Sequence, residues 1–338
     1  MKVFFIGACA LDSMGGDTME AHVHDGLKSL GIETSYFQFV RDGLNRRIDR
    51  VLELAMTDFR WIKSTPVERS LLRAINDYQP DMVLMLLGNY VPPMTVHKIR
   101  HFTSAPIVCW CQDHMGTMGR QYIIGSKFDF IFAKDQVMVD LFRKFTGQKH
   151  VYYLPEACNP RVHCPVVASA ADRQRYRCDI TTAATLYYYR SEILESLAGM
   201  DMCIWGPVPR FYEGPLRHYA SGSSVFTHNK AACFGVSKIV LNTLFPMELG
   251  GLNARAFEVA GCGGFQLMTH AVAVAKHFVP GKEIETFSDL NELKEKVFYY
   301  LAHDQARQKI AEAGRKRAHA EHTYEIRLKD MLNIVGSS

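Results

Sequence analysis

The sequence predicts an α/β protein of two lobes, each a doubly wound, mostly parallel β-sheet covered by helices. Three observations support this prediction. The 338 residues exceed the size at which a single hydrophobic core usually stops growing. Short apolar, β-branched or aromatic segments alternate with helix-like segments along most of the chain. This alternation is interrupted once, at 155–176, by a stretch with three prolines and weak periodicity.

In the first half, the apolar segments predict strands and the segments between them predict helices. Most of these strands lack a clean polar and apolar alternation, which is typical of strands buried on both faces of a parallel sheet. The expected strands are at 3–6, 34–39, 82–87, 107–110, 128–132 and 151–154. The expected helices are at 18–30, 44–55, 67–78, 94–101 and 135–145.

The second half repeats the alternation after the proline-rich break. Strands are expected at 178–182, 202–204, 238–241 and 265–268, with helices at 191–198, 252–261, 289–302 and along the charged tail 305–334. We therefore expect an N-terminal lobe at 1–158, a linker at 159–176, a C-terminal lobe at 177–320 and a final helix at 321–338. Two such lobes predict an inter-lobe cleft at the carboxyl ends of the strands.

Composition excludes several classes of protein. With 48% apolar and 22% charged residues and no biased tract, the chain is globular rather than disordered. The net charge of +4 is too small for a dedicated nucleic-acid binder. The apolar N-terminal run is too short for a signal peptide, and no stretch is long enough to span a bilayer, so we expect a cytoplasmic protein. The nine cysteines lack paired C-x-x-C spacing, which favours reduced thiols and no metal centre.

The loop after the first strand is a candidate acceptor or phosphate loop. Gly15 and Gly16 allow a ligand to approach the backbone just before a helix begins, and Asp12 and Asp17 supply carboxylates. An alternative is a flexible turn in which Asp17 or Thr18 caps the helix. The spacing does not match G-x-G-x-x-G, which disfavours a nicotinamide-dependent dehydrogenase.

A second candidate site in this half follows the fourth strand. Asp113 and His114 place an acid and an imidazole at the carboxyl end of that strand, where such groups can remove a proton from a hydroxyl. The alternative is a structural loop in which the acid caps a helix beside a packing histidine.

Two segments of the second half are candidates for phosphate or sugar binding. Arg190 opens a helix after a strand, and its planar, permanently charged guanidinium suits a phosphate. Trp205 and Gly206 end the next strand, although a structural turn is the simpler explanation for them alone.

The most informative segment is 248–267. Gly250 and Gly251 precede a helix whose first-turn amides can hold an anion. Arg255 and Glu258 are three residues apart on this helix, so both are available to a pyrophosphate and a ribose. An intrahelical ion pair with glycines at turns is the alternative.

These residues resemble a known family. The motif Asn253-x-Arg255-x-Phe257-Glu258, followed by a glycine-rich turn at 260–264, is similar to the group 1 glycosyltransferase signature of CgeB-like proteins, named after the spore maturation protein CgeB. Further matches occur at 154–157, 190–194, 238–242, 278–283, 290–301 and 322–327. The resemblance covers the C-terminal lobe well and the N-terminal lobe only in general form.

The resemblance implies the GT-B fold, two Rossmann-like lobes whose last helix crosses back to the N-terminal lobe. It also implies that the C-terminal lobe holds the nucleotide. By motif position Glu258 would bind the ribose hydroxyls, Arg255 and Asn253 would face the pyrophosphate or sugar, and Arg190 would reach a phosphate. Many relatives have another acid eight residues before the ribose glutamate, where this chain has Gly250.

The expected function is therefore transfer of a sugar from a nucleotide-diphosphate sugar to an acceptor hydroxyl. The acceptor is a glycan, a protein, a small molecule or a nucleic acid. No Asp-x-Asp pair occurs, so we expect a metal-independent enzyme with no cofactor besides this co-substrate. Asp113 or His114 would be the base, with Asp12 or Asp17 as substitutes. The alternatives are a nucleotide-sugar epimerase or phosphorylase and a non-catalytic nucleotide-sugar or glycan-binding protein.

Overall fold

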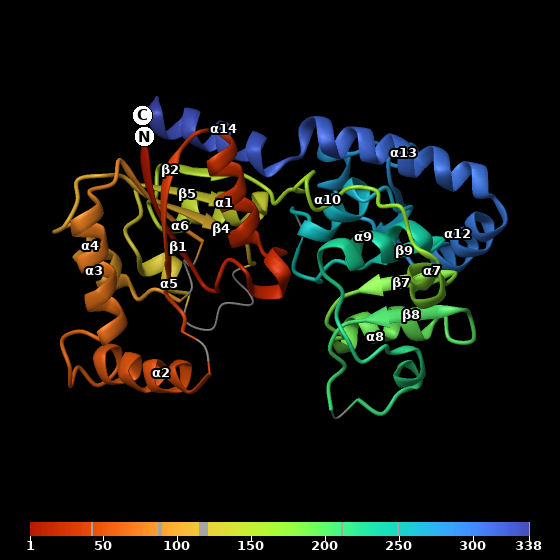
Figure 1. The fold of residues 1–338 in the computed structure, drawn as a ribbon, viewed down its shortest axis with the longest axis horizontal. Helices are drawn as coiled ribbons and strands as arrows, with labels where there is room; N and C mark the ends of the chain where they lie inside the picture. The colour runs from red at the N-terminus through yellow and green to blue at the C-terminus, as the bar shows by residue number, and fades with distance from the viewer. Residues whose placement is uncertain (42, 87–89, 115–120, 211, 249, 338) are drawn as a thin grey trace. The chain divides into compact units, whose positions relative to one another are not determined.

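The structure, a computed structural model, describes residues 1–41, 43–86, 90–114, 121–210, 212–248 and 250–337 (Figure 1). The chain divides into two compact units. The first unit consists of Met1–Pro155 together with Arg327–Ser338, and the second consists of Glu156–Ile326. Each unit is built on its own parallel sheet.

The sheet of the first unit has the strand order β2-β1-β3-β4-β5-β6, with every neighbouring pair parallel. Its strands are β1 (Lys2–Gly7), β2 (Glu33–Gln38), β3 (Met82–Met85), β4 (Ile107–Cys111), β5 (Phe130–Ala133) and β6 (Val151–Tyr153). All residues of β3, β4 and β5 are buried, as their uninterrupted apolar sequences predict. The expected end of the third strand, residue 87, lies outside the described residues.

Helices connect these strands, as the alternating pattern predicts. They are α1 (Met19–Ser29), α2 (Gly43–Thr57), α3 (Pro66–Tyr78), α4 (Pro93–Ile99), α5 (Tyr122–Gly125) and α6 (Gln136–Phe145), preceded by the short 3₁₀ helix η1 (Ser13–Gly16). Side-chain oxygens of Thr18, Thr65 and Asp135 accept hydrogen bonds from backbone amides in the first turns of α1, α3 and α6.

The second unit repeats the strand order of the first, as β11-β10-β9-β7-β8, again with parallel pairs. Its strands are β7 (Ile180–Ala183), β8 (Met202–Trp205), β9 (Ile239–Asn242), β10 (Gln266–Thr269) and β11 (Glu285–Phe287). Its helices are α7 (Ala170–Tyr176), α8 (Tyr188–Glu195), η3 (Pro215–Tyr219), α9 (Thr227–Val236), α10 (Ala254–Gly261), α11 (Val274–His277), α12 (Leu290–Ala302) and α13 (Asp304–Glu321).

The segment expected as a linker, 159–176, belongs to the second unit. Asn159, His163 and Tyr176 are buried in it, and its last part forms the helix α7. The boundary between the units falls earlier, after Pro155. Asn159 fixes the start of this segment, because its carbonyl accepts from the amides of Val162 and His163 at 2.9 and 2.7 Å.

The helical tail is interrupted at His322 and Thr323, between α13 and α14 (Tyr324–Gly336). Here the Cys158 amide donates to the His322 carbonyl at 2.9 Å, and the Tyr324 amide donates to the Cys158 carbonyl at 3.1 Å. Beyond this point, the residues 327–338 belong to the first unit.

The two parallel-sheet, Rossmann-like units confirm the fold class. In each sheet the second strand along the chain lies on one side of the first strand, and the later strands lie on its other side. The direction of winding therefore reverses between β1 and β3 in the first sheet and between β7 and β9 in the second. Ligands of doubly wound folds bind outside the carboxyl ends of strands at such a switch point. Within the described residues, no helix is both long enough and apolar enough to cross a membrane.

Candidate functional site

The second unit has a cavity of about 300 Å³ at the carboxyl ends of β9 and β10. The residues that follow these two strands form most of its wall, which is the position that the doubly wound topology predicts for a ligand. The cavity is lined by Tyr189, Leu244, Phe245, Pro246, Glu248, Thr269, His270, Ala271 and Val272.

Two arginines lie near one another in this part of the second unit. Arg190, on α8, donates from Nε to the Thr243 hydroxyl at 2.7 Å and from Nη1 to the Thr185 carbonyl. Burial, together with the positive charge of Arg255, lowers the pKa of Arg190 to about 10. The pKa of Arg255 is also lowered by burial, against the opposing effect of Glu258, Glu248 and other acids. Two mutually repelling cations shielded from water form a favourable environment for an anion.

Asn242, at the carboxyl end of β9, positions Arg255. Its Oδ1 accepts from Arg255 Nη1 at 3.1 Å and from Asn253 Nδ2 at 2.9 Å. Its Nδ2 donates to Asn253 Oδ1 at 3.0 Å and to Gln266 Oε1 at 2.8 Å. Both donors and both acceptor positions of this buried amide are therefore occupied, which fixes its orientation.

Asn253 is the N-cap of α10. Its Oδ1 accepts from the Ala256 amide at 3.1 Å, in addition to the reciprocal pair with Asn242. The side chain that was expected to face a pyrophosphate or sugar is thus engaged in holding the start of the helix. We infer a positioning role for Asn253, since it fixes the helix turn that carries Arg255.

Glu258 lies one turn further along α10. Its Oε2 is 3.1 Å from Lys230 Nζ on α9, and its Oε1 is 3.8 Å from His163 Nε2. The Glu258 side chain is only 15% exposed, and its charge also acts on Arg255 of the same helix. Glu258 forms an ion pair with Lys230, a residue of α9 that was not among the candidates from the sequence.

Glu248 is buried at the cavity wall. Its Oε2 accepts from the Phe245 amide at 3.2 Å, and its charge acts on both Arg190 and Arg255. Glu248 lies two residues before Gly250, the position at which many relatives have an acid. Gly250 and Gly251 lie between Glu248 and the start of α10, and Gly251 is buried.

Trp205 and Gly206 have structural positions. The Trp205 ring is buried and packs edge-on against Tyr176, with ring centroids 5.1 Å apart, so it belongs to the core rather than to the cavity wall. Gly206 has φ +147°, and a Cβ atom there would lie 2.2 Å from the Ala184 carbonyl oxygen. The glycine is required by this close backbone approach, as the turn alternative predicts.

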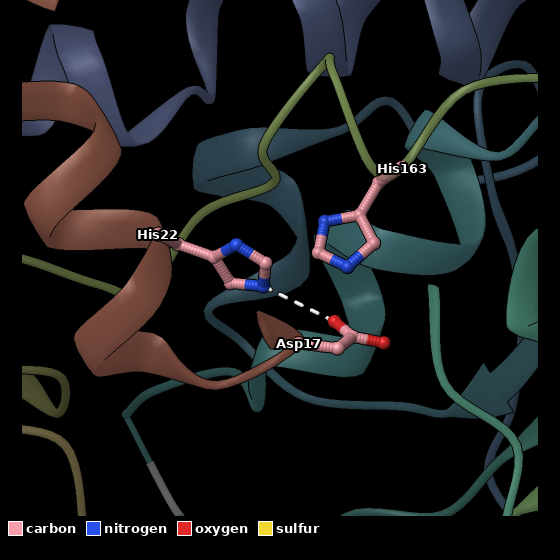
Figure 2. Close-up of side chains that lie close together, drawn as sticks. All are labelled: Asp17, His22 and His163. Atoms are coloured by element: carbon pink, nitrogen blue, oxygen red, sulfur yellow. Dashed lines mark hydrogen bonds and ion pairs between the residues drawn. The ribbon is translucent and has the colours of Figure 1, made fainter. Parts of the chain in front are cut away.

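The candidate residues of the first unit follow β1 and β4. Gly15 and Gly16 have left-handed backbones with φ of 67° and 81°. Asp17 is buried, and its Oδ1 lies 3.1 Å from His22 Nε2, as Figure 2 shows. Thr18 rather than Asp17 caps α1. Asp12 is exposed at the start of η1 and makes no capping hydrogen bond there.

Glu20 also holds the loop after β1 in place, and this role was not predicted from the sequence. It is buried in the first turn of α1, and its Oε1 accepts from the Ala8 amide at 3.0 Å. The hydroxyl of Tyr36 closes the loop from β2 by donating to the Cys9 carbonyl. An acid in the first turn of a helix after a glycine-rich loop was the available signal.

Asp113 and His114 lie directly after β4, as predicted. Asp113 is exposed and His114 is half-buried. The Cys111 thiol donates to the Asp113 carbonyl at 3.1 Å, which holds the backbone at the strand end. The β1 and β4 loops emerge at the same edge of the sheet, with β3 between their strands.

Comparisons with known proteins agree with this fold. Residues 190–333 match the family described as Glycosyl transferase-like. The spore protein CgeB of Bacillus subtilis (strain 168) is 22% identical over 286 residues, which cover 78% of this chain and 85% of CgeB. These matches confirm the resemblance to CgeB-like proteins that the motifs indicated.

Solved structures of low sequence identity share the whole fold. Sucrose-phosphate synthase from Thermosynechococcus elongatus has a TM-score of 0.69 at 11% identity, covering 99% of this chain and 98% of that chain. HepE of Anabaena in complex with UDP-glucose has a TM-score of 0.68 at 11% identity, with both chains fully covered. A glycosyltransferase from Rickettsia africae ESF-5 has a TM-score of 0.67 at 13% identity, covering 99% and 98%. The fold is therefore that of GT-B glycosyltransferases.

Proposed function

We propose that this glycosyltransferase-like chain moves a sugar from a nucleotide-diphosphate sugar to an acceptor hydroxyl, and that its second unit binds the donor. The single observation that carries the assignment of the donor to this unit is the pair Arg190 and Arg255. Each is held by a hydrogen bond to the protein, and burial lowers the pKa of each. A bound diphosphate would stabilise the charged form of both guanidinium groups.

The leaving group of sugar transfer is the nucleoside diphosphate, whose charge increases as the glycosidic bond breaks. Arg190 and Arg255 would stabilise that charge, because fixed cations lower the energy of a developing anion without reorganising. The start of α10 lies beside Arg255 and adds the positive end of a helix dipole. Glu258, one turn further, would accept hydrogen bonds from the ribose hydroxyls.

The acceptor hydroxyl needs a base, which we assign to the first unit. Asp113 is the preferred candidate because it is exposed at a strand end, where an acceptor can reach it. Asp17 is less suited, because it is buried and its Oδ1 already contacts His22. His114 and Asp12 remain as substitutes. We further propose that the reaction needs no metal ion and no cofactor besides the nucleotide sugar.

A thermal-shift screen of nucleoside diphosphates and nucleotide sugars tests the donor site. A ligand present at 100 times its Kd stabilises the folded state by about 2.7 kcal/mol, which is easily measured as a higher Tm. UDP and UDP-glucose belong in the panel because HepE binds UDP-glucose on the same fold. The nucleotide that gives the largest shift is then used for turnover assays with candidate acceptors.

The products of those assays separate the alternatives. A transferase releases the nucleoside diphosphate in proportion to acceptor. An epimerase returns an isomeric nucleotide sugar without release, and a binding protein does neither. If no nucleoside diphosphate or nucleotide sugar raises the Tm, the proposed donor site is wrong.

A further inference from the structure

Helix α2 of the first unit exposes large apolar side chains to solvent on one of its sides, whereas an ordinary surface helix exposes its polar face. All fifteen residues 43–57 are described, and Met56 alone is buried. A cavity of about 100 Å³ lies between part of the helix and the rest of its unit. On the α2 side this cavity is lined by Arg46, Asp49, Arg50, Glu53 and Met56.

The outward side of α2 is a continuous apolar stripe. Leu44, Ile48 and Val51 recur at spacings of four and three residues, so they lie on one face of the helix. Their exposed fractions are 72%, 45% and 65%. Figure 1 shows α2 lying away from the sheet of its own unit, beyond the ends of α3 and α4.

Two aromatic residues extend this stripe past the end of the helix. Phe59 and Trp61 are 57% and 76% exposed, and their rings stack with centroids 4.7 Å apart. Their amides donate to the carbonyls of Leu54 and Ala55 at 3.2 and 2.8 Å, so the segment is held against the last turn of α2. Leu44, Ile48, Val51, Phe59 and Trp61 are referred to below as the apolar stripe.

The charges around the apolar stripe are mainly positive. Five cations in 43–63 are exposed, whereas Asp58 is the one acid in that range with an exposed side chain. Asp49 is paired with Arg41, and Glu53 accepts a hydrogen bond from the Tyr122 hydroxyl at 2.8 Å. The exposed cations are Arg46, Arg47, Arg50, Arg60 and Lys63.

We propose that α2 and the Phe59–Trp61 segment bind the surface of an anionic lipid bilayer. An amphipathic helix with arginines on its polar side and large apolar and aromatic residues on the other lies in the interface of a membrane. Tryptophan favours that interface, because its ring is apolar and its indole N–H is polar. The excess of exposed cations selects anionic lipid over a neutral surface. This inference does not depend on the donor site.

The test is co-sedimentation of the full chain with phosphatidylcholine vesicles that contain or lack phosphatidylglycerol. Binding is expected with the anionic vesicles and should weaken at high salt, because surface charges are screened. Trp61 provides a second readout. It is the exposed member of the three tryptophans, since Trp110 and Trp205 are buried, so insertion should shift the emission of the protein to shorter wavelength.

Two variants examine the two parts of the surface. Ile48→Glu/Val51→Glu places charges in the apolar stripe and should weaken vesicle binding by at least about tenfold. Arg47→Gln/Arg60→Gln should weaken it by about fivefold for each charge removed. Val167→Glu is the matched control, because Val167 is 97% exposed on the second unit, and its binding should equal that of the unmodified chain. Unchanged melting temperatures would show that the variants remain folded.

Several results would overturn the proposal. One is the absence of co-sedimentation with anionic vesicles. Another is binding of the Ile48→Glu/Val51→Glu variant as strong as that of the unmodified chain. A third is a dimer, seen by sedimentation velocity, that this variant dissociates while no vesicle binding occurs. That result would assign the apolar stripe to a second copy of the chain.

Discussion

The substitution Glu258→Gln tests the donor site most directly, because the structure gives Glu258 two separable roles. One is the proposed ribose contact, and the other is the ion pair with Lys230 at 3.1 Å. The amide keeps the volume of the side chain but loses its charge and part of its acceptor capacity. A hydrogen bond to a charged group contributes about 1.5–3 kcal/mol, so nucleoside diphosphate affinity should fall about ten- to a hundredfold.

Stability should also fall, because the Lys230 side chain is only 10% exposed and loses its anionic partner. The remaining amide oxygen still accepts a hydrogen bond, so we expect a loss of about 1–3 kcal/mol rather than the larger cost of removing one ion of a buried pair. The Tm should decrease by about 2–4 °C for each kcal/mol.

Lys230→Gln is the matched control, because it breaks the same ion pair and leaves the Glu258 carboxylate for the ribose. The assay is calorimetric titration of both variants with the nucleoside diphosphate that gives the largest thermal shift. The Glu258 variant should lose far more affinity than the Lys230 variant at a similar decrease in Tm. Equal affinities for the two variants would refute the ribose role and reduce Glu258 to a structural partner of Lys230.

Three further predictions concern the reaction and the fold. Asp113→Asn should lower kcat about 10²- to 10⁴-fold with donor affinity unchanged, and an unchanged kcat together with an inactive His114→Ala would move the base to His114. Turnover should persist in EDTA, and a complete loss that only Mn²⁺ or Mg²⁺ restores would contradict the metal-independent proposal. Gly206→Ala should destabilise the protein by more than about 2 kcal/mol in thermal unfolding. The reason is that the added Cβ would lie 2.2 Å from the Ala184 carbonyl oxygen, at a residue with a positive φ. A Tm equal to that of the unmodified chain would show that the turn can relax.

Most strands could be predicted from the sequence, because a strand buried on both faces needs an uninterrupted apolar segment. β11 could not be predicted in this way, because the burial of its polar residues depends on partners outside the strand. Glu285 in β11 is buried through Lys296 at 3.0 Å and the Tyr300 hydroxyl, both on α12. A short strand with a charged residue gives no local hydrophobic signal, so β11 was not expected.

In the candidate site too, relations within one helix can be predicted from the sequence, whereas contacts between helices cannot. Arg255 and Glu258 lie on one helix, and their spacing is readable from the sequence. The contact of Glu258 with Lys230 joins two helices and has no sequence spacing of its own. The capping role of Asn253 could not be assigned from the sequence, because an N-cap and an anion ligand use the same residue type. Only the hydrogen bond to the Ala256 amide distinguishes them.

The two-part composition of the first unit has a consequence for folding during synthesis. Leu328 and Met331, from the last residues of the chain, are fully buried, and they are assigned to the unit that begins at Met1. That unit therefore cannot complete its packing until residues 327–338 have been synthesised, whereas the second unit is continuous and has all its residues earlier. A ribosome that stalls before residue 327 would release a chain whose second unit can fold and whose first unit exposes an apolar surface, a substrate for chaperones.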